Sequence, residues 1–180
     1  NILSIYNQAL SNERNDWYKD AHNWAKGFVL TDTDFNRFCG IVSALSPLKK
    51  WEENKSMAVN YWISGGHIPH MRQFAQKAVD ICNSDGENAT VLRILRGAKI
   101  CSFYNNIRYP NAGNVVTVDR HALSIAIGRF MHNHEQGLTK NQYEFFRHCY
   151  VWTANELEIS PQYLQGVTWS AWRRLKTNYK

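Results

Sequence analysis

The chain has 180 residues, a net charge of +6 and 44% hydrophobic residues, with only ten glycines and four prolines. This length suits one domain, or two small lobes that share a cleft, and buries about 70% of the surface that the unfolded chain exposes. The composition excludes disordered, collagen-like and low-complexity classes, and no apolar run approaches the ~18 residues of a membrane span. The basic excess permits a polyanionic partner without requiring one.

Apolar residues recur at helical spacing along nearly the whole chain, which predicts an all-α protein of about nine or ten helices. The first two predicted helices cover residues 17–28 and 35–45, and the second ends before Pro47. A third helix is predicted from Lys50 to Ile63 and ended by Gly65-Gly66. A fourth is predicted to open at Pro69 and to run to Cys82.

The middle of the chain contains a helix stop followed at once by a helix start. Residues 91–95 predict a short helix that stops at Gly97, and residues 100–107 predict the next helix. A loop over 108–114 leads into 115–118, a short extended stretch without an obvious partner strand. Three more helices are predicted after it, which open at Asp119, at Thr139 and at Ser160-Pro161, and no linker divides them. We therefore expect residues 1–180 to form a single compact domain, with two lobes as the alternative.

The four cysteines are widely spaced and form no CxxC pair: Cys39, Cys82, Cys101 and Cys149. Zinc and iron–sulfur sites need clustered ligands, so we expect no metal and no other cofactor. Reduced, buried thiols are typical of a cytoplasmic protein.

Lys99 and Asp119 each stand at a predicted helix N-terminus, about twenty residues apart. Backbone N–H groups at the helix start after Gly97 form a ready phosphate site. The helix dipole opposes a cation in the first turn, which favours a neutral amine at Lys99. Taken singly, Lys99 fits a surface lysine and Asp119 an N-cap, so the case for chemistry rests on their spacing.

Four segments resemble, in family order, the helix-hairpin-helix DNA glycosylase superfamily, which includes endonuclease III and 8-oxoguanine glycosylase. Leu95-Arg96-Gly97-Ala98-Lys99-Ile100 is similar to the second half of the family's hairpin, and Val118-Asp119-Arg120-His121 is similar to its V-D-x-H element. Ala44-Leu45-Ser46-Pro47 resembles the L-S-A-Q segment, and Gln76-Lys77-Ala78 resembles the R/K-K-A helix. The resemblance covers roughly residues 35–130.

The chain departs from the family pattern at three places. Leu95-Arg96 replaces the first hairpin glycine, Leu48 stands near the glutamine that fills the gap left by a flipped base, and the iron–sulfur cysteines are absent. In style the chain looks closest to small phage-encoded proteins of glycosylase fold, whose relatives include amino acid:DNA transferases of thymine hypermodification. The resemblance therefore implies a monomeric DNA enzyme of a bacterial or phage-infected cell, without membrane association.

The resemblance also implies a role for each candidate residue. Lys99 would attack the sugar C1′ as a neutral amine, and Asp119 would stabilise the oxocarbenium-like sugar or relay protons. The target base must first leave the duplex stack, so the implied partner is a DNA duplex with a flipped nucleotide. The candidate pocket residues are Trp51, Asn54, Tyr104, Asn106 and His121. The candidate DNA contacts are Ser46, Lys49, Lys50, Arg96, Gly97 and Arg120.

Structural alternatives stand beside these roles. Trp51 also fits a core position, Lys49-Lys50 a solvated pair, and His121 a structural hydrogen bond. The tryptophans and arginines of the last helix predict packing plus a basic face: Trp169, Trp172, Arg173 and Arg174. Three functions remain open at this level: a DNA glycosylase with lyase activity, a phage DNA base-modifying transferase on the same fold, and a DNA-binding module without catalysis.

Overall fold

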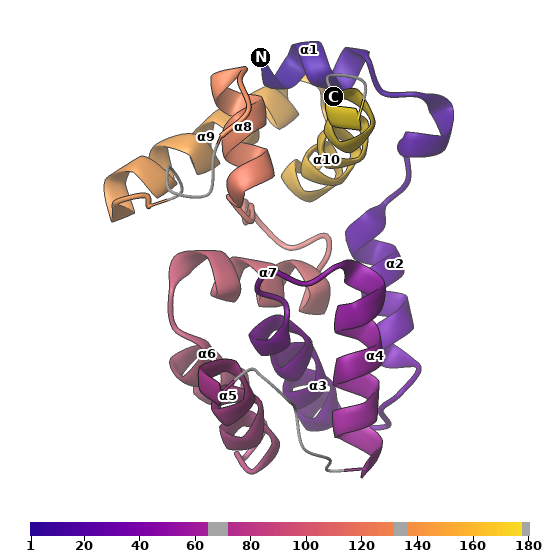
Figure 1. Ribbon diagram of the computed structural model, residues 1–180, viewed down its shortest axis with the longest axis vertical. Coiled ribbons are helices and arrows are strands. Elements are labelled where there is room, and N and C mark those ends of the chain that lie inside the picture. The colour runs from indigo at the N-terminus through magenta and orange to yellow at the C-terminus, as the bar shows by residue number, and fades with distance from the viewer. Residues whose placement is uncertain (65–71, 132–136, 178–180) are drawn as a thin grey trace. The chain divides into compact units, whose positions relative to one another are not determined.

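The computed structural model describes residues 1–64, 72–131 and 137–177, and these form ten α-helices, one short 3-10 helix and no strand (Figure 1). The predicted all-α class and helix number are therefore confirmed for this part of the chain. The predicted helix end at Gly65-Gly66 and the predicted start at Pro69 lie outside the described residues. Among the described helices, none combines the length and the apolarity that a membrane span requires.

The chain divides into two compact units, each described by itself. Unit 1 contains residues 1–20 and 109–180, and unit 2 contains residues 21–108. The boundary at residue 20 falls inside α2 (Trp17–Lys26). The predicted single domain and the cleft between lobes stay predictions.

Unit 2 is built around α3 (Asp32–Leu45), which packs against the helices on every side of it. Thr31 caps α3 by accepting a hydrogen bond from the Asp34 N–H at 3.1 Å, as its place before the apolar stripe predicts. A Cβ at Gly40 would meet Val91 Cγ1 at 2.7 Å, so this close approach requires glycine. The surrounding helices are α4 (Trp51–Ser64), α5 (Arg72–Cys82), α6 (Asn88–Leu95) and α7 (Ala98–Arg108).

Unit 1 joins the two ends of the chain in one core. Its helices are α1 (Ile2–Asn7), the 3-10 helix η1 (Ser11–Glu13), α8 (Arg120–Ile127), α9 (Lys140–Glu156) and α10 (Pro161–Thr177). The core contains residues from both ends, among them Ile2, Ile5, Leu164 and Ala171. The sequence patterns did not predict α1, because six residues are too few to show a helical period.

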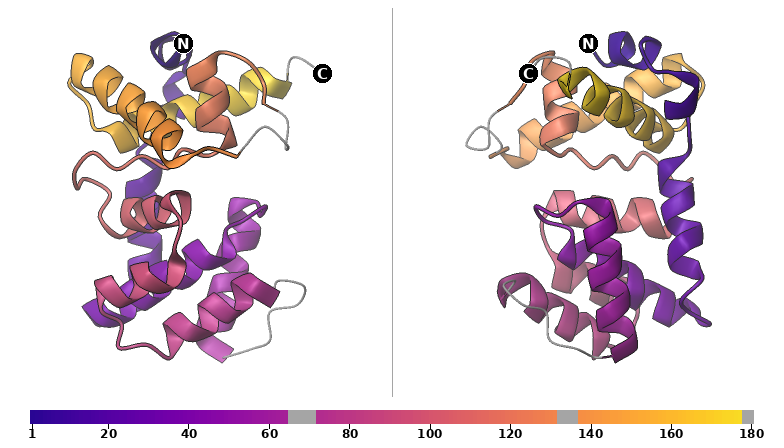
Figure 2. Two further views of the ribbon diagram at one scale, coloured as in Figure 1. Left: turned by 90° about the vertical axis from the view of Figure 1, so that its left-hand side faces the viewer. Right: turned by 45° about the vertical axis from the view of Figure 1, so that its right-hand side comes forward.

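The extended stretch at 115–118 forms no strand (Figure 2). Side chains rather than a neighbouring strand bind its backbone. The Gln165 side chain accepts from the Thr117 N–H at 2.9 Å and donates to the Thr117 carbonyl at 2.6 Å. The Tyr143 hydroxyl donates to the Val116 carbonyl at 3.0 Å and accepts from the Val118 N–H at 3.2 Å. These bonds explain how a buried extended segment is stable without a sheet, since buried backbone groups need partners.

Candidate functional site

Asp119 lies half-buried at the junction between the extended stretch and α8. Its Oδ1 accepts the Ala122 N–H at 2.8 Å, and its own N–H donates to the Thr117 carbonyl at 2.8 Å. The predicted cap of α8 is therefore confirmed. Within the described part of the chain no hydrogen bond to the second carboxylate oxygen is found. One oxygen thus fixes the carboxylate at the start of α8.

The first turn of α8 is anchored to the neighbouring helices of unit 1. The Tyr150 hydroxyl donates to the Ala122 carbonyl at 3.1 Å, and the Tyr150 side chain is fully buried. Burial raises the pKa of Tyr150 well above its usual value, and the Asp119 charge adds to this shift. Tyr150 is therefore a neutral hydrogen-bond donor that holds the residues around Asp119 in place.

His121 stands in the same first turn of α8, half-buried and edge-on to Trp169 with 6.3 Å between ring centroids. Burial lowers the pKa of His121 below its usual value; Asp119 opposes this shift, and Arg120, Lys176 and Arg173 add to it. At neutral pH the imidazole next to the Asp119 carboxylate is therefore uncharged.

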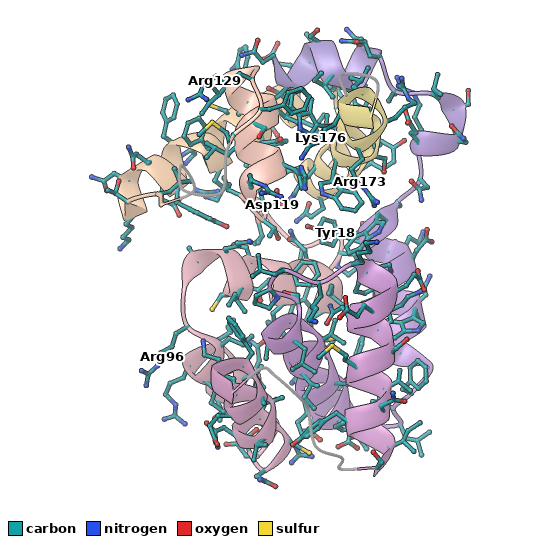
Figure 3. The ribbon with its side chains drawn as sticks, in the orientation of Figure 1. Tyr18, Arg96, Asp119, Arg129, Arg173 and Lys176 are labelled. Atoms are coloured by element: carbon teal, nitrogen blue, oxygen red, sulfur yellow. The ribbon has the colours of Figure 1, made fainter. Side chains whose placement is uncertain are left out.

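Three cations lie near His121, one from α8 and two from α10. The Arg173 guanidinium lies 4.7 Å from the centroid of Trp169, and Lys176 follows one turn later on α10 (Figure 3). Within the described residues neither Arg173 nor Lys176 forms a salt bridge, whereas Arg174 pairs with Glu13 at 2.8 Å. The predicted basic face of the last helix thus divides into one structural arginine and two cations near His121.

The helix stop and helix start predicted around Gly97 are confirmed in unit 2. α6 ends at Leu95 and α7 begins at Ala98, while Arg96 and Gly97 have φ values of +50° and +84°. The Lys77 ammonium donates to the carbonyl of Leu95 and so holds the turn. Lys99, Arg96 and Gly97 are all exposed at the start of α7.

Lys99 and Asp119 belong to different units, so their pairing stays a prediction. The Lys99 side chain is exposed in the first turn of α7 rather than buried. The burial that would help to keep a lysine amine neutral is thus not found at this position.

Three predicted pocket residues lie in the core of unit 2. Tyr104 and Asn106 are fully buried, Asn54 is nearly so, and the Tyr104 hydroxyl donates to Asn88 Oδ1 at 2.9 Å. A base cannot stack on a ring that is completely covered by protein. The Tyr104 ring therefore packs inside the core of unit 2, and its place in a substrate pocket stays a prediction.

Trp51 packs against other aromatic residues, which agrees with the core position that the sequence allowed for it. Its ring packs edge-on against Trp24, with 5.3 Å between centroids, and the Lys55 ammonium lies 5.7 Å from its centroid. Trp51 is only half-buried at the start of α4. It is thus a packing residue at the edge of the aromatic core of unit 2.

The loop between α3 and α4 brings together predicted DNA contacts and one residue that the patterns did not single out as a site. Ser46 Oγ donates to the Ser43 carbonyl at 2.9 Å, Lys49 pairs with Glu53 at 2.5 Å, and Lys50 is exposed. Leu48 between them is fully exposed and has a φ of +62°, a conformation that leucine rarely adopts. The sequence patterns do not predict that Leu48 is exposed. The available signal was its position near the glutamine that, in the glycosylase family, fills the gap left by a flipped base.

The helices and these side chains define an all-α protein with a carboxylate and a neutral imidazole bordered by cations. Within the described residues no group of three or more His, Cys, Asp or Glu side chains is placed to hold a metal ion. The chain belongs to DUF7178, a family of unknown function whose model matches residues 1–176. No curated protein and no solved structure matches the chain.

Proposed function

We propose that this protein is a DNA glycosylase that removes a modified or damaged base from a flipped nucleotide, with Asp119 as its catalytic carboxylate. The observation that carries the proposal is the state of Asp119. One of its oxygens is held by the Ala122 N–H, and the neutral His121 in the same first turn of α8 lies within the field of Asp119 and of the cations Arg120, Arg173 and Lys176.

This arrangement suits hydrolysis of a glycosidic bond. When the bond between C1′ and the base breaks, its electron pair leaves with the base and positive charge develops on the sugar. A carboxylate fixed beside the sugar stabilises that charge, or accepts the proton of the water that attacks C1′. The cations around it suit the phosphates that flank a nucleotide in a strand.

Leu48 supplies the apolar wedge of the proposed enzyme. Flipping a base costs a few kcal/mol, and proteins that unstack DNA insert leucine or similar side chains between base steps. Leu48 is fully exposed in a strained conformation and is followed by Lys49 and Lys50. Backbone strain of this kind is frequent at functional sites, and together with the full exposure of an apolar side chain it supports the assignment.

The exposure of Lys99 favours a second candidate, the DNA base-modifying transferase. A lyase forms a Schiff base and needs a neutral amine, which burial favours. A transferase that adds a group to a base needs no Schiff base, and it would use the same DNA-facing residues.

The test is Asp119→Asn, because asparagine keeps a good N-cap while removing the negative charge. We expect base release to fall at least about 100-fold, the usual scale for loss of a group that stabilises transition-state charge. The melting temperature should stay close to that of the wild type. Release is measured by mass spectrometry on duplexes with oxidised, alkylated or deaminated bases and on phage-type modified DNA.

Asp16→Asn is the matched control, because Asp16 also caps a helix in unit 1: its Oδ1 accepts the Lys19 N–H at 3.2 Å. This variant should keep full activity. Borohydride trapping of wild type and of Lys99→Ala on an abasic duplex tests the lyase step. A mass gain on thymine without base release identifies the transferase, and binding without any reaction in either assay contradicts both enzymatic candidates.

A further inference from the structure

We infer that Arg120, Arg173 and Lys176 form a phosphate site beside Asp119, and that it holds the backbone phosphate of the nucleotide that reacts. This inference rests on the proposed function for the identity of the strand. The site lies entirely within unit 1, between the first turn of α8 and the second half of α10. The exposed N-terminus of α7 with Lys99 belongs to unit 2 and is no part of this site.

The α10 side of the site is a single helical face. Trp169, Arg173 and Lys176 are spaced by four and three residues, which places them in line along the helix. The Arg173 guanidinium is stacked on the Trp169 ring at 4.7 Å, so its orientation is restricted before any ligand binds. An arginine held in this way can present two N–H groups to a phosphate.

The adjacent Arg174 has a different environment from Arg173. Its guanidinium donates to Glu13 at 2.8 Å and to the Gln8 carbonyl at 2.8 Å, so it is used in the packing of unit 1. Arg173 and Lys176 form no such ion pair within the described residues. Two cations therefore remain near the site while their neighbour is neutralised.

The α8 side of the site carries Asp119, and the first turn of α8 lies beside the Trp169 face of α10. His121 contacts Trp169 edge-on, so the first turn of α8 lies beside the ring on which Arg173 rests. Arg120 begins α8 directly after Asp119, and the α8 and α10 helices are in contact (Figure 3). Arg173 and Lys176 outnumber the one carboxylate, which leaves the site positively charged when His121 is neutral.

The combination of charges indicates the substrate class. A nucleotide within a strand carries a phosphate a few bonds from its C1′, so the phosphate can bind the cations while the sugar faces Asp119. A free base or a nucleoside lacks the group that these cations would bind. The site thus selects a strand-borne nucleotide over a nucleoside.

The experiment measures binding rather than reaction, with the full chain and a fluorescein-labelled 12-nucleotide DNA followed by anisotropy. We expect Arg173→Gln and Lys176→Gln each to weaken binding about 5- to 30-fold and to lower the slope of log K against log salt by about one. Asp119→Asn should bind several-fold more tightly, because it removes a negative charge that faces the phosphate. Lys140→Gln is the matched control, since Lys140 is an exposed lysine of unit 1 at the start of α9; it should stay within about twofold of the wild type.

Competition identifies the source of the phosphate. The unlabelled oligonucleotide should displace the labelled one, dTMP and inorganic phosphate should do so far more weakly, and thymidine should have no effect. Displacement by dTMP as effective as that by the oligonucleotide would overturn the strand-borne assignment. Losses with Arg173→Gln and Lys176→Gln no larger than with Lys140→Gln would overturn the site itself.

The two proposals fail in different ways. If the binding pattern is as expected but no base is released or modified on any substrate, the phosphate site stands and the proposed function is wrong. If bases are released and both α10 variants keep the wild-type KM, the phosphate site is wrong and the proposed function stands.

Discussion

Two non-glycine residues in the described part of unit 2 have unusual backbone conformations. Leu48 and Arg96 have φ values of +62° and +50°, and both are exposed in turns that lead into helices. A left-handed conformation costs a non-glycine residue about 1–2 kcal/mol. At Leu48 no packing compensates for this cost, because the side chain is fully exposed.

Leu48→Gly should therefore raise the stability of the protein and at the same time lower its rate of base release. Relief of the strain exceeds the added chain entropy of glycine, so the free energy of unfolding should rise by up to about 1 kcal/mol. Base release should fall at least about tenfold, because the wedge is removed. Urea unfolding measures the first effect. The rate of base release and the fluorescence of 2-aminopurine beside the target base measure the second.

Glu158→Gly is the control for this prediction. Glu158 has a φ of +54° in the turn between α9 and α10, so it carries the same kind of strain. Its replacement should raise stability without changing activity. An equal loss of activity in both variants would contradict the wedge.

His121 makes the stability of unit 1 depend on pH. Burial lowers its pKa, whereas in the unfolded chain the pKa is near its usual value of about 6.5. As pH falls below about 6.5 the unfolded chain takes up the proton first, so stability is lost until the pKa of the folded state is passed. Above about 6.5 this contribution is fully present. His121→Gln should flatten this part of the stability curve, measured by urea unfolding between about pH 4.5 and 7.5.

His148→Gln, at an exposed position of α9, is the control for the substitution itself. A curve for His121→Gln that keeps the wild-type slope would show that another group is responsible.

At the scale of elements, the extended segment before α8 depends on one glutamine of α10. Gln165 makes two hydrogen bonds to the Thr117 backbone and is almost fully buried. Gln165→Ala should lower the free energy of unfolding by about 2–3 kcal/mol, because both buried bonds are lost. It should also reduce base release, since Asp119 follows the segment directly. Chemical unfolding and the base-release assay check the two effects.

Gln76→Ala provides the comparison, since Gln76 is exposed on α5 and bonds only across one helical turn to Asp80 at 2.8 Å. Its cost should not exceed about 0.5 kcal/mol. If Gln165→Ala costs no more than this, the side-chain clamp does not hold the segment.

Across the whole molecule, the two units differ in how the chain builds them. Unit 2 is continuous in sequence, whereas unit 1 joins residues 1–20 to residues 109–180. Asn1 donates to the Ala126 carbonyl at 3.0 Å, and Arg174 pairs with Glu13 at 2.8 Å. The candidate site of unit 1 thus lies in a unit whose core depends on both ends of the chain.

Apart from α1, the sequence by itself determined which of the described segments are helical and where several of these helices start. The caps at Thr31, Asp119 and Thr139 and the opening of α10 at Pro161 occur where the patterns predict. Helix periods and caps use residues three or four positions apart, so they can be read locally. The same local reading places the turn at Gly97 and the exposed start of α7.

Only the tertiary structure decided which side chains are available to a ligand. It buried Tyr104, left Leu48 exposed, and paired Gln165 with Thr117 across 48 positions. It also placed the Arg173 face of α10 beside the first turn of α8, where the sequence indicated only a basic face. Burial and hydrogen bonding between distant segments depend on how helices pack, and packing is set by the whole set of contacts rather than by any local pattern.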